Sequence, residues 1–192
     1  FPKASLVLMA LNLSDLASVR GFAAEFSASF QQLHMLINNA GEMALPYQKT
    51  ADGFEMQFAT NHLGHFALTG LLLTPILNTP GARVVNVSSG MHRSGTMDFD
   101  DLNWEKSYSK WGAYGRSKLA NLLFAYELER KFKAAHIDAI STGAHPGYAA
   151  TNLQTGGGSG LQKTTRSIDD WASDCWSRGG IMYRTLGTPG KR

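Results

Sequence analysis

The sequence has little that could cross-link the chain or hold it in a membrane. Its 192 residues include one cysteine, Cys175, which excludes an internal disulfide and favours a reducing compartment. We interpret Cys175 as a small apolar residue rather than a nucleophile. The longest apolar run, 65–77, is shorter than a membrane span and contains His65 and Pro75, so it predicts a core helix. We therefore expect no membrane span and a cytoplasmic location.

Excess charge of one sign is also scarce. The chain has 18 Lys and Arg against 15 Asp and Glu, a formal net charge of +3. The densest basic group, Arg130, Lys131 and Lys133, ends a predicted helix, where cations suit the helix dipole. Nucleic-acid binding is therefore not expected. With 43% hydrophobic and 17% charged residues, the composition predicts one globular domain over residues 1–192.

The sequence alternates between short apolar runs, which predict strands, and segments of helical periodicity. The runs cover residues 5–10, 33–41, 82–90 (the clearest) and 137–147. The helical segments cover residues 14–30, 50–78 and 113–135. We expect Ser14 to be the N-cap of the first helix and the second to break near Thr60 and Asn61. This order predicts an α/β fold with a parallel sheet covered on both faces.

The pattern fades after Leu153, so residues 154–192 predict a poorly defined tail. Within it, residues 155–160 form a glycine-rich run that predicts a flexible loop. Residues 167–187 fit a helix weakened by an internal Gly-Gly pair.

Polar residues gather where the carboxyl ends of neighbouring strands are expected, which is where ligands bind in a doubly wound sheet. "INNAG" ends the run at 37–41, and "NVSSG" ends the run at 86–90. Tyr114 and Lys118 follow four positions apart, on one face of the strongest predicted helix. Serine, tyrosine and lysine thus converge without forming a metal set or a hydrolase triad.

Five motifs in this order resemble the short-chain dehydrogenase/reductase family. They are "NNAG" at 38–41, "NHLGHFALT" at 61–69, "VVNVSS" at 84–89, Tyr114 with Lys118, and "HPGYAAT" at 145–151. The phrase "TNHLGHFALTGLLL" and the long loop after residue 90 are most similar to its retinol-dehydrogenase and protochlorophyllide-reductase-like branch. The resemblance covers roughly residues 5–153 and implies a Rossmann-like doubly wound parallel sheet and hydride transfer between a nicotinamide and a carbonyl or alcohol.

The resemblance also implies a role for each catalytic residue. Tyr114 would give a proton to the carbonyl oxygen or take it back from the alcohol. Lys118 would lower the pKa of that phenol, which is ordinarily near 10, and would hold the nicotinamide ribose. Ser89, with Ser88 as the alternative, would bind the substrate oxygen. Asn61 would bind a water that relays protons through Lys118.

The implied cofactor is NADP or NAD, with NADP slightly favoured. The implied contacts are Asn38, Asn39, Ala40, Gly41, Tyr114, Lys118, Pro146, Gly147 and Thr151. The implied partner is a small-molecule carbonyl or alcohol, preferentially apolar, and an oligomer is compatible with the sequence. No metal is expected, because His62 and His65 have no carboxylate beside them and fit helix-face hydrogen bonding better. Ser89 with His92 lacks the Gly-x-Ser-x-Gly turn of a hydrolase.

The sequence departs from the family where the cofactor's pyrophosphate is normally held. The expected glycine-rich turn is absent, and the cluster at Gly156–Gly158 follows the last clear strand. Asn12 stands where the family usually has an aspartate. Because the chain begins at Phe1 rather than Met, we expect it to be an N-terminally truncated piece of a longer protein. It would then be part of a working oxidoreductase or, alternatively, a non-catalytic remnant or interaction module that keeps the fold.

Three structural expectations follow. Without the strands that normally separate them, residues 5–10 should either pair in parallel with residues 33–39 or be displaced from the sheet. The apolar edge left at 33–39 should favour association or low stability. The loop from Gly90 to Gly112 should either cover the site as a lid for a bulky apolar substrate or simply pack on the domain. Its large side chains are Met91, Phe99, Trp104, Tyr108 and Trp111.

Overall fold

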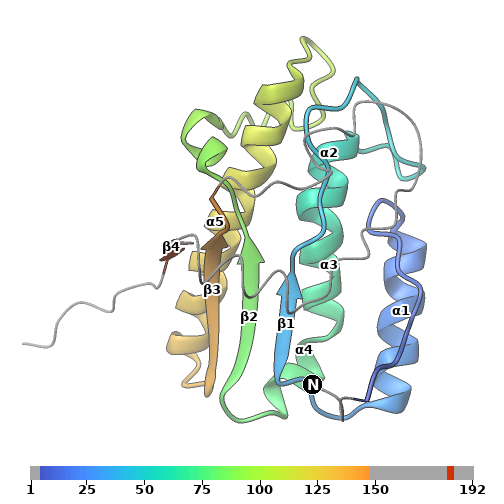
Figure 1. Ribbon diagram of the computed structural model, residues 1–192, viewed down its shortest axis with the longest axis vertical. Helices are drawn as coiled ribbons and strands as arrows, with labels where there is room; N and C mark the ends of the chain where they lie inside the picture. Colours follow the sequence, from blue (N-terminus) through green and yellow to red (C-terminus); the bar gives the residue numbers. More distant parts are fainter. Residues whose placement is uncertain (1–4, 148–180, 184–192) are drawn as a thin grey trace, which may run out of the picture.

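The computed structural model describes residues 5–147 and 181–183 (Figure 1). In chain order its elements are α1 (Leu16–Ser29), β1 (Met35–Asn38), α2 (Met56–Phe58), the π-helix η1 (Ala59–Leu63), α3 (Gly64–Leu71), α4 (Leu73–Leu77), β2 (Ala82–Val87), the 3₁₀-helix η2 (Gly90–Ser94), α5 (Lys110–Ala134), β3 (Ala139–His145) and β4 (Ile181–Tyr183). The predicted α/β architecture is confirmed.

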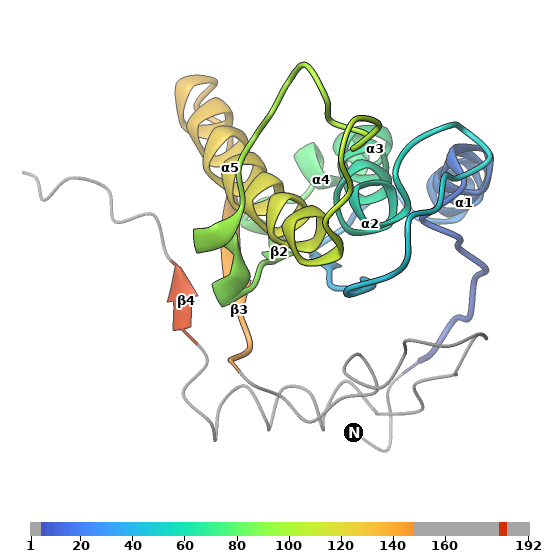
Figure 2. The ribbon, with the colours of Figure 1, turned by 90° about the horizontal axis from the view of Figure 1, so that it is seen from above.

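The strands form one sheet in the order β1-β2-β3-β4. β1, β2 and β3 are mutually parallel, and β4 runs antiparallel to β3. Figure 2 shows that the helices of the described part lie on one face of this sheet, with α1 beyond the β1 edge. Coverage of both faces, which the sequence predicted, is therefore not seen within residues 5–147 and 181–183.

The position of each strand in the sheet explains its burial. β2 lies between two neighbours and is buried almost throughout, as its continuous apolar sequence predicted. β1 is an edge of the described sheet, and Met35 and Ile37 are 50% and 37% exposed. The prediction of a buried strand over residues 33–41 was wrong in length and burial, because β1 has one neighbouring strand instead of two.

A single apolar core lies between the sheet and the helices. Its members come from α1, α3, α4, β2 and α5, and include Val19, Ala23, Leu68, Leu72, Ile76, Val84 and Phe132. α1 packs against α3 on the side away from α5 (Figure 2). Because this core fixes α3 against β2, it also fixes the π-helix that precedes α3.

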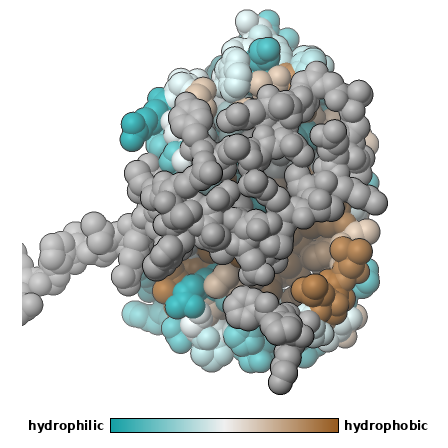
Figure 3. Space-filling view, viewed as in Figure 1, coloured by the Kyte–Doolittle hydropathy of each residue, from teal (hydrophilic) through white to brown (hydrophobic). Residues whose placement is uncertain are grey.

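Residues 5–12 take no part in the sheet, which is the second of the two expected arrangements. They run beside α1, and Leu6 and Leu8 are 89% and 101% exposed (Figure 1). Figure 3 shows apolar side chains gathered on this side of the molecule. The N-cap of α1 is Asp15 rather than Ser14, because the Asp15 carboxylate accepts the backbone N–H groups of Ala17 and Ser18.

The break predicted near Thr60 and Asn61 is confirmed as the π-helix η1, although the helical run begins at Met56 rather than at residue 50. The helix expected over residues 167–187 is wrong at Ile181–Tyr183, which is a strand because it pairs with β3. Cys175, the glycine cluster at 155–160 and Thr151 lie outside the described residues. No helix in the described part is long and apolar enough to cross a membrane.

Candidate active site

Tyr114 lies in the first turns of α5 and reaches back to the end of β2. Ser109 caps this helix, since its hydroxyl oxygen accepts the backbone N–H of Gly112 at 3.2 Å. Tyr114 is 4% exposed, and the side chain of Ser89 lies close to its phenol. Burial raises the pKa of Tyr114, and the Ser89 side chain offsets part of that rise. The phenol is thus held as a neutral acid beside a serine hydroxyl.

Lys118 lies one turn further along α5 and is 4% exposed. Its Nζ donates to the Val87 carbonyl at 3.2 Å and lies 5.7 Å from the centroid of the Tyr114 ring. Burial lowers the pKa of Lys118 to about 8. The expected lowering of the Tyr114 pKa was wrong in direction for this structure, because burial of the phenol dominates.

The two consecutive serines after β2 have different surroundings. The Ser88 hydroxyl donates to the Lys118 carbonyl at 2.8 Å, so it ties the strand to α5. Ser89 is half-buried and faces Tyr114, and its hydroxyl oxygen also accepts the N–H of Met91 at 3.3 Å. The geometry therefore favours Ser89 over Ser88 as the partner of a substrate oxygen.

Asn61 is fully buried in the π-helix and clamps the chain that follows β1. Its amide nitrogen donates to the Glu42 carbonyl and to the Ser117 hydroxyl, both at 2.9 Å, while its amide oxygen accepts the Glu42 N–H at 2.7 Å. Its backbone carbonyl accepts from Asn121 Nδ2 at 2.9 Å and lies 3.0 Å from His65 Nδ1. The observed role of the side chain is to position residue 42, and the water relay stays a prediction.

This clamp brings Gly41 directly against the catalytic helix. A Cβ at Gly41 would lie 2.9 Å from Asn61 Oδ1 and 3.5 Å from Lys118 Nζ, so a side chain there would fill the space beside the ammonium. Asn39 and Ala40 are exposed at the same end of β1. The resemblance implies that these three residues line the cofactor's sugar, and that contact stays a prediction.

Asn38 behaves differently from its neighbours, because it is 2% exposed and bonds inside the protein. Its amide nitrogen donates to Thr69 Oγ1 at 3.0 Å and to Asn86 Oδ1 at 2.9 Å, linking β1, α3 and β2. Asn38 therefore fixes the end of the strand, and its expected contact with the cofactor stays a prediction.

At the end of β3, Pro146 is half-buried and Gly147 is exposed with φ +71°. The Gly147 N–H donates to His145 Nδ1 at 3.3 Å, which turns the chain away from the strand. Both residues lie at the same edge of the sheet as Ser89, because β2 and β3 are parallel neighbours. Their predicted contact with nicotinamide is compatible with this placement.

The residues around Gly41 fit a nicotinamide ribose. An ammonium carries three N–H donors, and within the described part Lys118 uses one of them on Val87. The Nζ of Lys118 borders the space that a side chain at Gly41 would fill, 3.5 Å from the position of a Cβ there. A sugar with vicinal hydroxyls would supply the missing acceptors.

The two histidines of the helical run form helix-face hydrogen bonds, as the sequence indicated. His62 Nδ1 lies 3.0 Å from Asn121 Oδ1, and His65 Nδ1 lies 3.0 Å from the Asn61 carbonyl. Burial lowers the pKa of both rings, that of His65 to about 4. Across residues 5–147 and 181–183, no group of three or more His, Cys, Asp or Glu could hold a metal ion.

The loop after η2 carries two kinds of aromatic side chain. Trp104 and Tyr108 pack onto the domain, with ring centroids 6.2 Å apart. Trp111 is 46% exposed, and its ring lies edge-on to Tyr114 with centroids 6.5 Å apart, while Phe99 is 76% exposed. Trp111 is therefore the aromatic residue best placed to meet a substrate at Tyr114.

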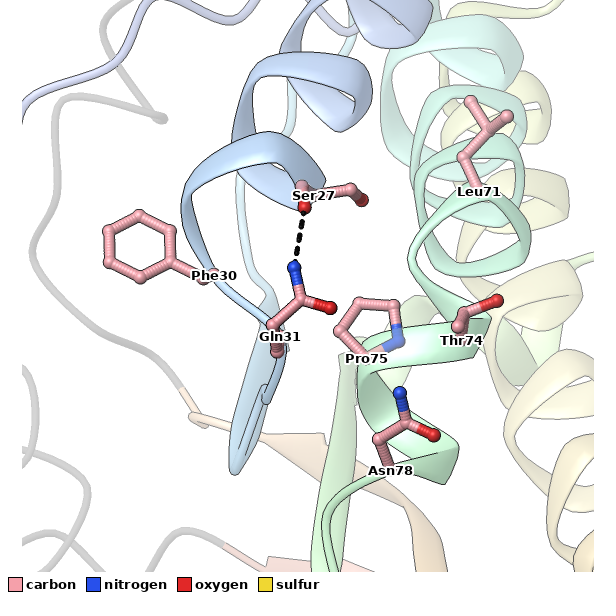
Figure 4. A pocket seen from close by; sticks show the side chains of 7 residues that line it. All are labelled: Ser27, Phe30, Gln31, Leu71, Thr74, Pro75 and Asn78. Atoms are coloured by element: carbon pink, nitrogen blue, oxygen red, sulfur yellow. Dashed lines mark hydrogen bonds between the residues drawn. The ribbon is translucent and has the colours of Figure 1, made fainter.

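Sequence reasoning missed three polar residues near the site: Glu42, Gln57 and Arg116. Arg116 carried a usable signal, since it is a charged residue between Tyr114 and Lys118 on a helix whose next turns are apolar. A separate pocket of about 300 Å³ lies at the other end of the fold, between the C-terminal ends of α1 and α4 (Figure 4). Its lining contains none of the predicted site residues.

Comparison with known proteins identifies the relatives of this chain. Residues 3–160 match the family model described as short chain dehydrogenase. The chain is 48% identical over 148 residues to "Retinol dehydrogenase 14" and 50% identical over 143 residues to "Retinol dehydrogenase 11", both from Homo sapiens. These alignments cover 77% and 74% of this chain but 44% of each relative. The chain thus spans less than half the length of the curated relatives it matches.

Two solved structures support the same fold. An uncharacterized protein from Mycobacterium Paratuberculosis is 53% identical, with a TM-score of 0.66 over 76% of this chain and 52% of that one. A short chain dehydrogenase/reductase from Burkholderia phymatum, solved in complex with NAD, is 19% identical, with a TM-score of 0.62 over 97% of this chain and 64% of that one. The latter resemblance supports the fold alone.

Proposed function

This chain belongs to the short-chain dehydrogenase family, and we propose that its protein is an NAD(P)-dependent oxidoreductase that interconverts an apolar alcohol and its carbonyl compound. The observation that carries the proposal is the buried pairing of Tyr114 with Ser89, with the Lys118 ammonium beside the same ring. A non-catalytic remnant is less well supported, because all three side chains are retained and brought together.

The proposed division of labour follows from the surroundings of each group. The cofactor supplies the hydride. Ser89 donates a hydrogen bond to the carbonyl oxygen and holds it beside Tyr114, whose raised pKa keeps the phenol protonated and ready to donate. Lys118 binds the ribose hydroxyls and offsets the negative charge left on the phenol. Asn61 holds Gly41 against Lys118, which orients the cofactor.

For the cofactor, we propose NADP in preference to NAD, and for the substrate a retinoid-like or other long apolar aldehyde or alcohol. The relatives' names support this substrate class, and so does the exposed indole of Trp111 next to Tyr114. Parallel assays of the full-length protein with NADPH and NADH would settle the cofactor. A preference for small polar carbonyls over long apolar aldehydes would reject the substrate class.

The decisive test is Tyr114→Phe in the full-length protein. Removal of the phenolic proton should lower kcat by about 10²- to 10⁴-fold, because a positioned proton donor contributes that much. Cofactor affinity, measured by titration, should change little, since the substitution removes one oxygen and almost no volume. Tyr126→Phe on the same helix is the matched control, because Tyr126 is 41% exposed. A Tyr114→Phe enzyme within a few-fold of wild type would end the assignment.

A further inference from the structure

Residues 95–109, here called the strap, join η2 to α5. Figure 2 shows the chain between these elements arching from η2 past α5 toward α2. The strap therefore lies between α5, which carries Tyr114 and Lys118, and the helical run that carries Asn61. The sequence left open whether this loop is a lid or a segment packed on the domain, and in this structure it is fastened to the domain at several points.

The first fastening is a close approach of two backbone segments, at Gly95 in the strap and at Gly115 in α5. A Cβ at Gly95 would collide with the carbonyl oxygen of Gly115, which directly follows Tyr114. A Cβ at Gly115 would lie 3.0 Å from the Met91 carbonyl oxygen. The chain entering the strap thus lies against α5 beside the catalytic tyrosine, where any larger residue would push the two apart.

The second fastening is the side chain of Arg116, which is 3% exposed. Its Nε donates to the Thr96 carbonyl at 2.9 Å, and its Nη1 donates to the carbonyls of Asp101 and Leu102. The guanidinium carbon lies 4.1 Å from the centroid of the Trp104 ring. One planar cation therefore holds four strap residues at once, through hydrogen bonds and a cation–π contact.

The third fastening joins the strap to α2 and to the chain after Gly41. The Tyr108 hydroxyl donates to the Leu45 carbonyl at 2.8 Å and accepts from Gln57 Nε2 at 2.8 Å. The amide oxygen of Asn103 accepts the Glu55 N–H at 3.1 Å. These contacts reach the helical run that carries Asn61.

The strap thus connects α5, which carries Tyr114 and Lys118, with the run that carries Asn61. We propose that Arg116 is a positioning residue that holds Tyr114 in place by fastening the strap to the catalytic helix. The inference rests on the proposed function, since it assigns a role in the same reaction. Arginine suits this role because its rigid, planar fork of N–H donors spreads over carbonyls several residues apart, whereas the ammonium of a lysine is compact and lacks that spread.

The charges around Arg116 fit a permanent structural cation. Burial lowers the pKa of Arg116, and the carboxylates of Asp98, Asp101 and Glu55 offset part of that effect by favouring the charged form. Asp101 is itself fixed, because its carboxylate accepts the N–H groups of Glu105 at 2.7 Å and Lys106 at 3.2 Å. The carbonyl acceptor that Arg116 uses at residue 101 is therefore held in place by the strap's own structure.

The test compares Arg116→Gln, Arg116→Lys and the control Arg130→Gln in the full-length protein. Arg130 lies on the same helix, but it is exposed and pairs with Glu127. Arg116→Gln should lower kcat about 10- to 100-fold, because small misplacements of a reacting group cost that much, while the KM for cofactor stays within about threefold. Arg116→Lys should fall between glutamine and wild type, and Arg130→Gln should match wild type.

A second readout needs no activity. Phe99 is 76% exposed on the strap, so chymotrypsin cleavage after Phe99 reports release of the strap. Cleavage should be at least about tenfold faster in Arg116→Gln and intermediate in Arg116→Lys. If Arg116→Gln does not fold, Arg116→Lys decides the test. Its kcat should then be lower than that of wild type, and its cleavage after Phe99 should be faster.

A folded Arg116→Gln protein with wild-type kcat, or with wild-type cleavage after Phe99, would overturn the proposal. A lower melting temperature with unchanged kcat would also overturn it, since that result indicates a merely structural role. If wild-type protein shows no nicotinamide-dependent turnover, the proposed function fails. The cleavage rates would then still decide whether Arg116 fastens the strap.

Discussion

The ammonium of Lys118 is buried beside Tyr114, and its pKa falls to about 8 from an ordinary 10.5. Between these two values the unfolded chain keeps a proton that the folded chain has lost. Stability should therefore rise as pH increases from about 8 to about 10.5, because the penalty for burying the charge is full below 8 and disappears above 10.5. The difference corresponds to about 3 kcal/mol.

Lys118→Met should accordingly be more stable than wild type at pH 7, and its advantage should shrink as pH rises through that window. Denaturant unfolding at pH 7, 8, 9 and 10 measures this difference, with Lys131→Met as an exposed control on the same helix. The full-length Lys118→Met enzyme should at the same time lose activity. An advantage that does not change with pH would refute the assignment of a buried, charged lysine.

At the scale of single residues, the sequence predicted that a serine after β2 would converge with Tyr114 and Lys118 at one edge of the sheet, because each lies in a motif that its own short segment of chain defines. It did not predict that Asn38 would bond inside the protein or that Arg116 would hold a loop. Those roles depend on hydrogen-bond partners 14 to 48 positions away in the chain. It also misjudged the pKa of Tyr114, since burial is a property of packing rather than of spacing.

Among the elements, the π-helix at Ala59–Leu63 carries Asn61, one of the predicted site residues. The sequence located a break near Asn61 but not its form, because a π-turn is a change in hydrogen-bond register that side-chain periodicity does not report. As a result, the backbone carbonyl of Asn61 contacts two side chains: it accepts from Asn121 Nδ2 and lies 3.0 Å from His65 Nδ1.

The buried ring of His65 should make this element sensitive to acid. Its pKa is lowered from 6.5 to about 4, chiefly by burial, so the unfolded chain takes up a proton that the folded chain refuses. Stability should fall as pH drops from about 6.5 to about 4, by up to about 3 kcal/mol from this residue. In His65→Gln that contribution should be absent, so the stability difference from wild type should change with pH over the same window.

Unfolding curves at pH 4.5, 5.5 and 6.5 provide the measurement. His34→Gln, at an exposed position beside β1, controls for the loss of an imidazole. If wild type and His65→Gln lose stability in parallel as pH falls, His65 is not the acid-sensitive group.

For the molecule as a whole, local pattern predicted which segments could be strands but not which would find a neighbour. Residues 5–10 have the apolar sequence of a strand, yet in the described part no strand lies beside them and they form none. Residues 181–183 lie in a segment that resembled a helix, and pairing with β3 makes them a strand instead. Strand pairing is a long-range property, and the sequence of one segment does not contain it.

At the scale of the whole molecule, the 192-residue chain should bind a dinucleotide only weakly. The sequence lacks a Gly-x-x-x-Gly-x-Gly turn, and no described strand is followed at once by a glycine-rich turn and an α-helix that could hold a pyrophosphate. Two lost charge-assisted hydrogen bonds, each worth roughly 1.5–3 kcal/mol, would weaken binding by a hundredfold or more. This chain alone should therefore bind NADP(H) and NAD(H) at millimolar level or not at all.

Calorimetry on the 192-residue chain tests this expectation, with Gly41→Val as the control. A valine at residue 41 would occupy the space beside Asn61 Oδ1 and Lys118 Nζ, so it should abolish any weak binding that uses this site. Weak binding that survives Gly41→Val lies elsewhere. Micromolar affinity that Gly41→Val removes would show that Lys118 and the turn after β1 hold a dinucleotide without a glycine-rich turn, because the contacts to nicotinamide and ribose would then supply most of the binding energy.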